Sequence, residues 1–310
     1  MTSSRRLGFR QHRLMTRRSP ISPGDLGVGF SVRDARAGGL SRSRLDAQDL
    51  LRPFWGTRIF ANDDSLATRM RALLSRLPPD AAISHSTAAM LWGIPLPNRL
   101  QRDDVHVSVP VGARAPQRRG IRGHQRSLSP ADTSAPFGFR MTIPARTWCD
   151  LAEQTTVPEL VAAGDFLVHW DSPLISIDAL GDYVDRQQIR RGLSVIRSAL
   201  PRLSDRAESY RESILRFLIV DSGFPSPEVN YEVRDERGRV IARVDLAWPN
   251  RKVALEYEGD HHRTDRAQWQ RDLRRVEALQ DAGWRVVRVS AEDLVAPEVL
   301  FARLRRLLQH

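Results

Sequence analysis

Residues 240–259 carry the sequence VIARVDLAWPNRKVALEYEG. Apolar side chains dominate both halves of this stretch, and the Pro249-Asn250 pair between them is typical of a turn. We therefore expect two neighbouring antiparallel strands, 240–248 and 252–258.

Side chains along the second strand alternate between its two faces, so Glu256 and Glu258 share one face, about 6–7 Å apart. Two carboxylates on an otherwise apolar strand are unfavourable unless they are paired or metal-bound. Strand pairing brings Asp245 beside Glu256, and Glu212, on a helix expected at 205–220, could supply a further oxygen ligand. These carboxylates could hold Mg²⁺, or Mn²⁺ in its place, beside a phosphodiester. The alternative is an edge strand whose glutamates simply face water.

The rest of the C-terminal region, 201–310, continues as an α/β pattern. Apolar periodicity and turn residues predict a helix at 205–220, strands at 229–233 and 284–290, a helix at 265–282, and a last helix capped by Ser290 and Asp293. The expected order is helix, three-stranded meander, helix, strand, helix.

This order resembles the core of the PD-(D/E)XK restriction-endonuclease-like nucleases. The likeness is strongest to domain-of-unknown-function family 559, relatives of the very-short-patch-repair (Vsr) endonuclease, and covers nearly all of 205–305. It is carried by Asp245 with Trp248-Pro249, Glu256-Tyr257-Glu258-Gly259, His261-His262, Arg271-Asp272, Arg274-Arg275 and Gly283-Trp284-Arg285-Val286-Val287-Arg288. The resemblance implies a Mg²⁺-dependent endodeoxyribonuclease that hydrolyses phosphodiester bonds without a covalent enzyme intermediate.

Within this resemblance, Asp245 corresponds to the motif aspartate and Glu256 to the acidic residue of the (D/E)XK element. Glu258 stands where the superfamily usually has lysine. Activation of water then falls to Glu258 itself, to the histidine pair that follows, with His262 favoured, or to a second metal-bound water. Lys252, the only lysine, is an alternative by strand parity, although such a position is more typical of a solvent-facing strand start.

Basic residues are concentrated at the N-terminus. The net charge is +11, and residues 1–60 hold 12 arginines against 4 acidic residues. Such an excess is the usual footprint of a polyanionic partner, and we expect DNA, with RNA as an open alternative. Residues 1–24 have no apolar periodicity and are expected to form a basic disordered leader, or to precede a true start at Met15.

Residues 25–62 have the pattern of a winged-helix-like DNA-binding region. Ser31 and Ser41 are candidate caps of two short helices, the second running to about residue 51, and a strand pair is expected around Gly56. Arg42 and Arg44 would then lie in the first turn of the second helix and contact DNA. Any short helical hairpin gives a similar pattern.

On the helix at 265–282, Arg271, Arg274 and Arg275 could contact phosphates. A solvated helix face is the alternative reading of the same three arginines.

Residues 63–200 are expected to form an α/β middle domain. We predict helices at 65–77, 84–92, 147–153, 157–170 and 187–200 and a strand at 104–111. The four histidines of this region, His85, His106, His124 and His169, are scattered along the chain. Each is expected to pack or to face solvent rather than to bind a ligand.

Three segments of the region around 28–200 resemble the N-terminal half of a set of actinobacterial proteins that is similar to the AbiEi-type antitoxins, which carry an N-terminal winged helix. The segments are Ser84-His85-Ser86-Thr87-Ala88-Ala89, Gly93-Ile94-Pro95-Leu96-Pro97 and Ala145-Arg146-Thr147-Trp148. The resemblance supports DNA binding. It also keeps open a rival function, a non-catalytic DNA-binding regulator or antitoxin-like protein with a decayed nuclease fold.

The composition restricts the class of protein. A single cysteine, Cys149, excludes an internal disulfide and a cysteine-based zinc site. No apolar run reaches the ~18–20 residues that span a bilayer, and no apolar stretch follows the basic N-terminus as in a secretory signal. We therefore expect a cytoplasmic protein with two or three domains and no membrane partner. A homodimer is left open.

Overall fold

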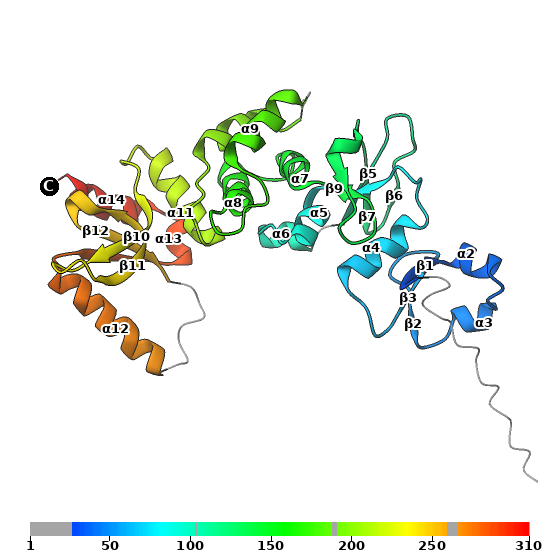
Figure 1. Ribbon diagram of the computed structural model, residues 1–310, viewed down its shortest axis with the longest axis horizontal. Coiled ribbons are helices and arrows are strands. Elements are labelled where there is room, and N and C mark those ends of the chain that lie inside the picture. The colour runs from blue at the N-terminus through cyan, green and yellow to red at the C-terminus, as the bar shows by residue number, and fades with distance from the viewer. Residues whose placement is uncertain (1–26, 103, 188–190, 259–265, 310) are drawn as a thin grey trace, which may run out of the picture. The chain divides into compact units, whose positions relative to one another are not determined.

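The computed structural model describes residues 27–102, 104–187, 191–258 and 266–309; within 266–273 it describes the backbone alone. The chain is a mixed α/β protein with two compact units, an N-terminal unit (Met1–Pro79) and a C-terminal unit (Asp80–His310) (Figure 1). The leader expected at 1–24 lies outside the described residues. Over the part of the chain that is described, no helix is long and apolar enough to cross a membrane.

The N-terminal unit contains a three-stranded antiparallel sheet in the order β1-β3-β2. Its elements are β1 (Gly29–Ser31), α2 (Val32–Ala37), α3 (Arg42–Leu45), β2 (Leu50–Leu51), β3 (Thr57–Phe60) and α4 (Leu66–Leu74). The Ser31 and Ser41 side chains accept hydrogen bonds from the Asp34 and Arg44 backbone N–H groups and so cap α2 and α3, as predicted.

The second helix is much shorter than predicted, because α3 ends at Leu45 instead of continuing to about residue 51. The buried Arg58 side chain donates to the Leu45 carbonyl and to Asp46, and the chain then turns so that Leu50 can pair with Phe60. The strand pair is thus β2 with β3, not two strands meeting at Gly56. Helix α4 packs on β1 and β3, so the expected boundary after residue 62 falls inside the N-terminal unit.

The C-terminal unit begins with a six-stranded mixed sheet in the order β6-β7-β5-β4-β9-β8. Its strands are β4 (Ala82–Ile83), β5 (Val105–Val109), β6 (Gln117–Arg118), β7 (Ile121–Gln125), β8 (Thr133–Ser134) and β9 (Met141–Thr142). Pairs β5–β7 and β4–β9 are parallel and the others antiparallel. Of these six strands, the sequence predicted only β5.

Helices surround this sheet and continue beyond it. They are α5 (His85–Trp92), α6 (Asn98–Gln101), α7 (Pro144–Leu151), α8 (Val157–Val168), α9 (Ile177–Arg186) and α10 (Leu193–Ala199). They share one apolar core that includes the fully buried Trp148 and Leu160. The single helix predicted at 187–200 is wrong in extent, since the helix there begins only after Gly192, a glycine with positive φ, and α9 was not predicted.

The second sheet has four strands in the order β10-β11-β12-β13. Its elements are α11 (Tyr210–Asp221), β10 (Glu228–Arg234), β11 (Val240–Trp248), β12 (Val253–Tyr257), α12 (Arg266–Asp281), β13 (Arg285–Val289), α13 (Ala291–Val295) and α14 (Glu298–Leu308). The first three strands form an antiparallel meander, and β13 returns parallel to β12. The one final helix that was predicted is two helices, since Pro297 separates α13 from α14.

The two faces of this sheet bury different side chains. Val253 and Leu255 pack with residues of α11 and α14, whereas Ala254 packs with Leu279 of α12. Figure 1 shows α12 on the face opposite α11 and α14. The alternation predicted for β12 is therefore confirmed, and it explains why the strand places its two apolar sets in separate cores.

Helix α11 also packs against α8, across the position where a domain boundary was expected at residue 200. Arg216 of α11 forms an ion pair with Asp165 of α8 at 2.8 Å, and these side chains are 11% and 1% exposed. Asp165 accepts a second hydrogen bond from the Ser204 backbone N–H at 2.8 Å. Burial raises the pKa of Asp165, and the Arg216 guanidinium opposes that shift.

We predict that Arg216→Leu lowers the free energy of unfolding by about 3–5 kcal/mol, because it leaves the Asp165 carboxylate buried without its countercharge. Urea denaturation at pH 7.5 measures the loss. The double variant Arg216→Leu/Asp165→Asn should recover much of it. As a control, Arg239→Ala removes an exposed ion pair with Asp235 and should cost less than about 1 kcal/mol. A similarly small cost for Arg216→Leu would contradict a stabilising role for this buried pair.

Candidate functional site

Asp245 lies on β11 at the point where its ladder with β12 ends. The last paired residues are Leu246 and Leu255, so Asp245 lies opposite Glu256. The Asp245 carboxylate accepts a hydrogen bond from the Tyr257 backbone N–H at 2.7 Å. The Asp245 side chain thus accepts the hydrogen bond that a backbone carbonyl of β11 would otherwise accept from β12. The carboxylate is half-buried as a result.

The pKa of Asp245 is raised to about 6. Burial is the largest cause, and the negative charges of Glu212 and Glu256 add to it, while the Tyr257 N–H and Arg275 act in the opposite direction. Three carboxylates from α11, β11 and β12 therefore act on one another at this end of the sheet.

Glu256 is half-buried on β12 and forms an ion pair with Arg275 of α12. The same guanidinium donates to the Arg243 carbonyl at 2.7 Å, so Arg275 spans the gap between helix and sheet. Arg275, which was predicted to contact nucleic acid, is thus paired with Glu256, which was predicted to bind a metal.

Glu212 is buried in the first turn of α11. Its carboxylate accepts from the Glu208 backbone N–H at 3.1 Å and from the Asn230 side-chain amide at 3.2 Å. Asn230 has a positive φ of 52° and lies opposite Asp245, between the paired residues Val229 and Tyr231. Sequence reasoning missed Asn230; the signal was an asparagine inside an otherwise strand-forming run, a residue that tolerates left-handed backbone.

Glu258 is exposed and pairs with Arg288 of β13 at 2.8 Å. Asp245, Glu256 and Glu212 therefore lie together, while Glu258 is turned to a different partner. Among the described residues, these carboxylates include no group of three whose ligand oxygens all lie within 4.8 Å of one another.

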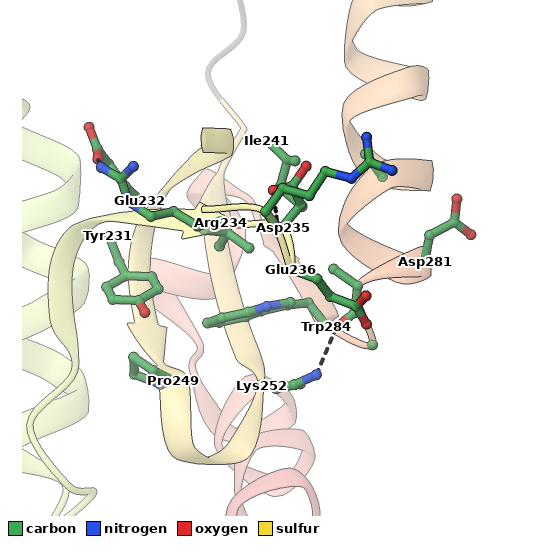
Figure 2. Close-up of a pocket in the computed structure, with 15 residues that line it drawn as sticks. Tyr231, Glu232, Arg234, Asp235, Glu236, Ile241, Pro249, Lys252, Asp281 and Trp284 are labelled. Atoms are coloured by element: carbon green, nitrogen blue, oxygen red, sulfur yellow. Dashed lines mark hydrogen bonds and ion pairs between the residues drawn. The ribbon is translucent and has the colours of Figure 1, made fainter. Parts of the chain in front are cut away.

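The other predicted residues are dispersed. Lys252 donates to the Ala282 carbonyl at 2.9 Å (Figure 2). It directly precedes β12 and so lies at the opposite end of that strand from Glu256. His261 and His262 lie outside the described residues, as does the side chain of Arg271. Arg274 and Arg42 are exposed, and Arg44 binds Asp49 through both guanidinium nitrogens at 2.8 and 2.6 Å.

An open hollow of about 1070 Å³ lies beside Lys252, between the β10–β11 turn and the end of α12. Trp284 forms its floor and lies next to Tyr231, with ring centroids 5.7 Å apart (Figure 2). None of Glu212, Asp245, Glu256 and Glu258 lines it. The hollow is therefore separate from the carboxylate cluster.

The scattered histidines are a second feature that sequence reasoning missed. His85, His106 and His124 meet, with one ring nitrogen of each within 4.8 Å of those of the other two. The spacing of these histidines in the sequence does not predict their meeting. They come from one helix and two strands, and the order of the strands in the sheet was not predicted.

The fold and these sites define a mixed α/β protein with an acidic cluster in its second sheet. Comparison with known proteins then gives its family. The chain is 32% identical over 274 residues to the uncharacterized protein Rv2248 of Mycobacterium tuberculosis strain H37Rv, covering 87% of this chain and 97% of the relative. The uncharacterized protein MT2308 of strain CDC 1551 matches equally. The chain belongs to the family of these mycobacterial proteins.

Two further comparisons add little. No family model matches the chain. The crystal structure of the RV2827C protein from Mycobacterium tuberculosis is similar at 15% identity and a TM-score of 0.37, covering 67% of this chain and 84% of that one.

We predict that Asp245→Asn stabilises the metal-free protein by about 1–3 kcal/mol at pH 7.5, because it removes a charge whose pKa is raised to about 6. Since a carboxyl with a raised pKa destabilises the fold only where it is ionised, the gain should fall as the pH drops below 6 and vanish near 4. Chemical denaturation at several pH values measures it. Asp235→Asn is the control: hydrogen bonds from Arg239 lower the pKa of Asp235, so this change should not stabilise. An equal gain from both variants would contradict the assignment.

Proposed function

We propose that the chain is a metal-dependent DNA endonuclease. The region 201–310 would be its restriction-endonuclease-like, Vsr-related catalytic domain, and the N-terminal unit would be a winged-helix-like DNA-binding module. The reaction would be phosphodiester hydrolysis.

The observation that carries this proposal is the cluster of Glu212, Asp245 and Glu256. Burial, with a smaller contribution from the negative charges of Glu212 and Glu256, raises the pKa of Asp245 to about 6. A cluster of ionised oxygens that is costly without a cation is what a hard divalent ion prefers as a ligand set. Bound here, Mg²⁺, or Mn²⁺ in its place, would acidify a water and neutralise charge on the scissile phosphate.

The order of elements gives independent support. Helix α11, the meander β10-β11-β12, helix α12 and the parallel strand β13 follow one another as the resemblance to family 559 implies. Asp245 lies within β11 where its ladder with β12 stops, and Glu256 lies opposite it near the end of β12, which suits the motif residues of that superfamily.

The remaining residues have proposed roles of their own. Arg275, next to Glu256, could move to a phosphate of the substrate once a cation replaces it as the countercharge. Glu258 or His262 would orient the attacking water, and the pairing of Glu258 with Arg288 would hold that carboxylate at the rim of the cluster.

One observation favours the rival function, a non-catalytic DNA-binding regulator. Glu256 and Glu258 both have arginine partners, Arg275 and Arg288, so their charges are compensated without a metal. A nuclease fold that had lost its activity would keep such arginine–glutamate pairs. RNA as the substrate is a further outcome that the same experiment distinguishes.

We predict that the purified protein nicks or cuts supercoiled plasmid with Mg²⁺ or Mn²⁺, and that Asp245→Asn and Glu256→Gln each slow cleavage by a factor of about 100 or more, because each removes a metal ligand. Agarose gels with and without EDTA measure the reaction.

The matched control for this assay is Glu232→Gln, an exposed acid of the same sheet that pairs with Arg234; it should cleave as the wild type does. Cleavage that survives both Asp245→Asn and Glu256→Gln would overturn the site. DNA binding without cleavage of duplex, single-stranded or mismatched DNA, or of RNA, would favour the regulator.

We predict that Arg42→Ala weakens duplex binding and lowers the slope of log affinity against log salt by about 0.9, the value for one lost phosphate contact. Fluorescence anisotropy at several salt concentrations measures it. Arg69 of α4, which pairs with Asp64 just before that helix, supplies the control variant Arg69→Ala, whose salt slope should match the wild type. Equal slopes for all three proteins would count against α3 as a DNA-contacting helix.

A further inference from the structure

Three histidines form a compact cluster between helix α5 and the six-stranded sheet. His85 is the first residue of α5, His106 lies on β5, and His124 lies on β7. One nitrogen of each ring lies within 4.8 Å of those of the other two. His85 and His106 are fully buried, and His124 is partly exposed, so the cluster reaches the surface through one member.

The strand register explains the meeting of His106 and His124. Strands β5 and β7 are parallel neighbours, and Ser108 pairs with His124. His106 is two positions before Ser108, so both histidines project from the same face of the sheet. Helix α5 is fastened to that face, because the His106 backbone N–H donates to the Thr87 hydroxyl at 2.9 Å.

The backbone of His85 has a positive φ of 52° at the start of α5. A residue with a side chain is rarely found there, and such a conformation costs on the order of 1 kcal/mol or more unless its surroundings enforce it. Here the conformation turns the imidazole onto the other two rings: the centroids of His85 and His124 are 3.8 Å apart.

Contacts outside the cluster orient two of the rings. His85 Nδ1 lies 2.9 Å from the Ser84 hydroxyl, and His106 Nε2 lies 3.2 Å from the Gln154 side-chain amide. The other nitrogen of His106, Nδ1, lies 2.9 Å from Nε2 of His124. Holding one ring nitrogen with a polar neighbour while the second faces inward is the usual arrangement of histidines that bind metals.

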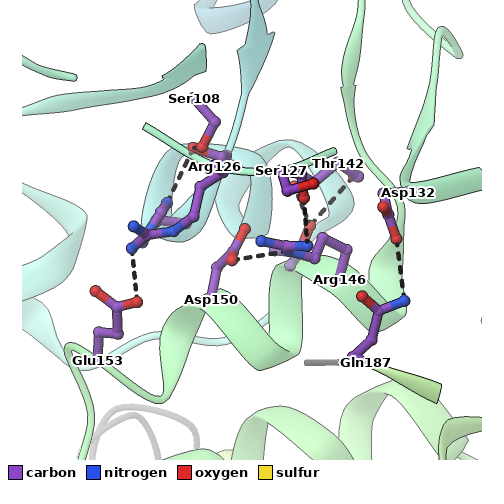
Figure 3. Close-up of polar contacts among 12 residues, drawn as sticks. Ser108, Arg126, Ser127, Asp132, Thr142, Arg146, Asp150, Glu153 and Gln187 are labelled. Carbon is purple, nitrogen blue, oxygen red and sulfur yellow. Dashed lines mark hydrogen bonds and ion pairs between the residues drawn. The ribbon is translucent and has the colours of Figure 1, made fainter. Parts of the chain in front are cut away.

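Four arginines act on the histidines, and two of them, Arg126 and Arg146, have acidic partners, whereas Arg122 and Arg191 are exposed. Arg126 approaches His85 Nε2 to 3.5 Å and is paired with Glu153 at 2.6 Å. Arg146 is paired with Asp150 at 3.0 Å (Figure 3). A cation at the histidines would therefore meet Arg126 and Arg146 with their charges compensated, and the exposed Arg122 and Arg191 with theirs screened by solvent.

We propose that His85, His106 and His124 bind one first-row transition-metal ion, with Zn²⁺ as its representative. Three imidazoles suit Zn²⁺ and its neighbours, whereas Mg²⁺ prefers oxygen. Zinc–nitrogen bonds of ~2.0–2.1 Å in a tetrahedron place the nitrogens about 3.3 Å apart. To reach this geometry, His106 Nδ1 and His124 Nε2, 2.9 Å apart, would separate slightly, and the stacked His85 and His124 rings would splay.

Bound in this way, the ion ties α5 to β5 and β7 and leaves a fourth coordination position for water or another ligand. The site is independent of the carboxylate cluster around Asp245, which lies on the other sheet of the C-terminal unit and offers oxygen ligands only.

The test is a Zn²⁺ titration of full-length protein, stripped with a chelator, against a chromophoric competitor. The double variant Asp245→Asn/Glu256→Gln serves as the background, so that the carboxylates do not contribute. We expect one tight equivalent, and a loss of affinity of about 100-fold or more in His106→Ala and in His124→Gln. His169→Ala, a histidine outside the cluster, should bind as the background does.

X-ray absorption of the Zn²⁺-loaded background protein reads the ligands directly, even if a histidine variant fails to fold. A first shell containing three imidazoles at ~2.0–2.1 Å is expected. The proposal is overturned if no stoichiometric Zn²⁺ binds, if His106→Ala and His124→Gln both keep the affinity of the background, or if the first shell lacks histidine.

Discussion

The hydrogen bond from the Tyr257 N–H to the Asp245 carboxylate joins β11 and β12 where their ladder stops. It is a bond between a charged acceptor and a backbone donor, stronger than a neutral one, and it keeps an ionisable group half-buried among apolar strands. Strand pairing places Glu256 opposite Asp245. The Asn230 side-chain amide donates a hydrogen bond to Glu212 of α11 and so holds that carboxylate near the other two. The acidic cluster is thus a consequence of where the ladder between β11 and β12 ends.

Arginine opposes most of the buried or half-buried acids that were described. Glu256 has Arg275, Asp150 has Arg146 and Asp165 has Arg216. A guanidinium stays charged at any accessible pH and binds a carboxylate through a planar fork, so it is a strong competitor for a divalent cation. A metal at Glu256, as proposed, would therefore have to replace Arg275 as the countercharge, whereas Asp165 is buried with Arg216 between α8 and α11.

The sequence predicted the second sheet well because its strands alternate cleanly and its turns carry Pro249-Asn250 and Gly238. Asp245, Glu256 and Glu212 were named from that pattern and lie together. The short α3 was not predictable, because its end depends on Arg58, 13 residues further along the chain, which donates to the Leu45 carbonyl. The histidine cluster was missed for a related reason: it depends on a parallel pairing of β5 with β7, which no local periodicity encodes.

The contact between α8 and α11 has a consequence for how such chains can diverge. Asp165 and Arg216 stand on opposite sides of the position where a linker was expected, and each is tolerable in the interior only because the other is present. The two halves of the C-terminal unit therefore cannot be inherited as free modules. A recombinant that joins one half to a foreign partner would be destabilised wherever only one member of this pair was carried across.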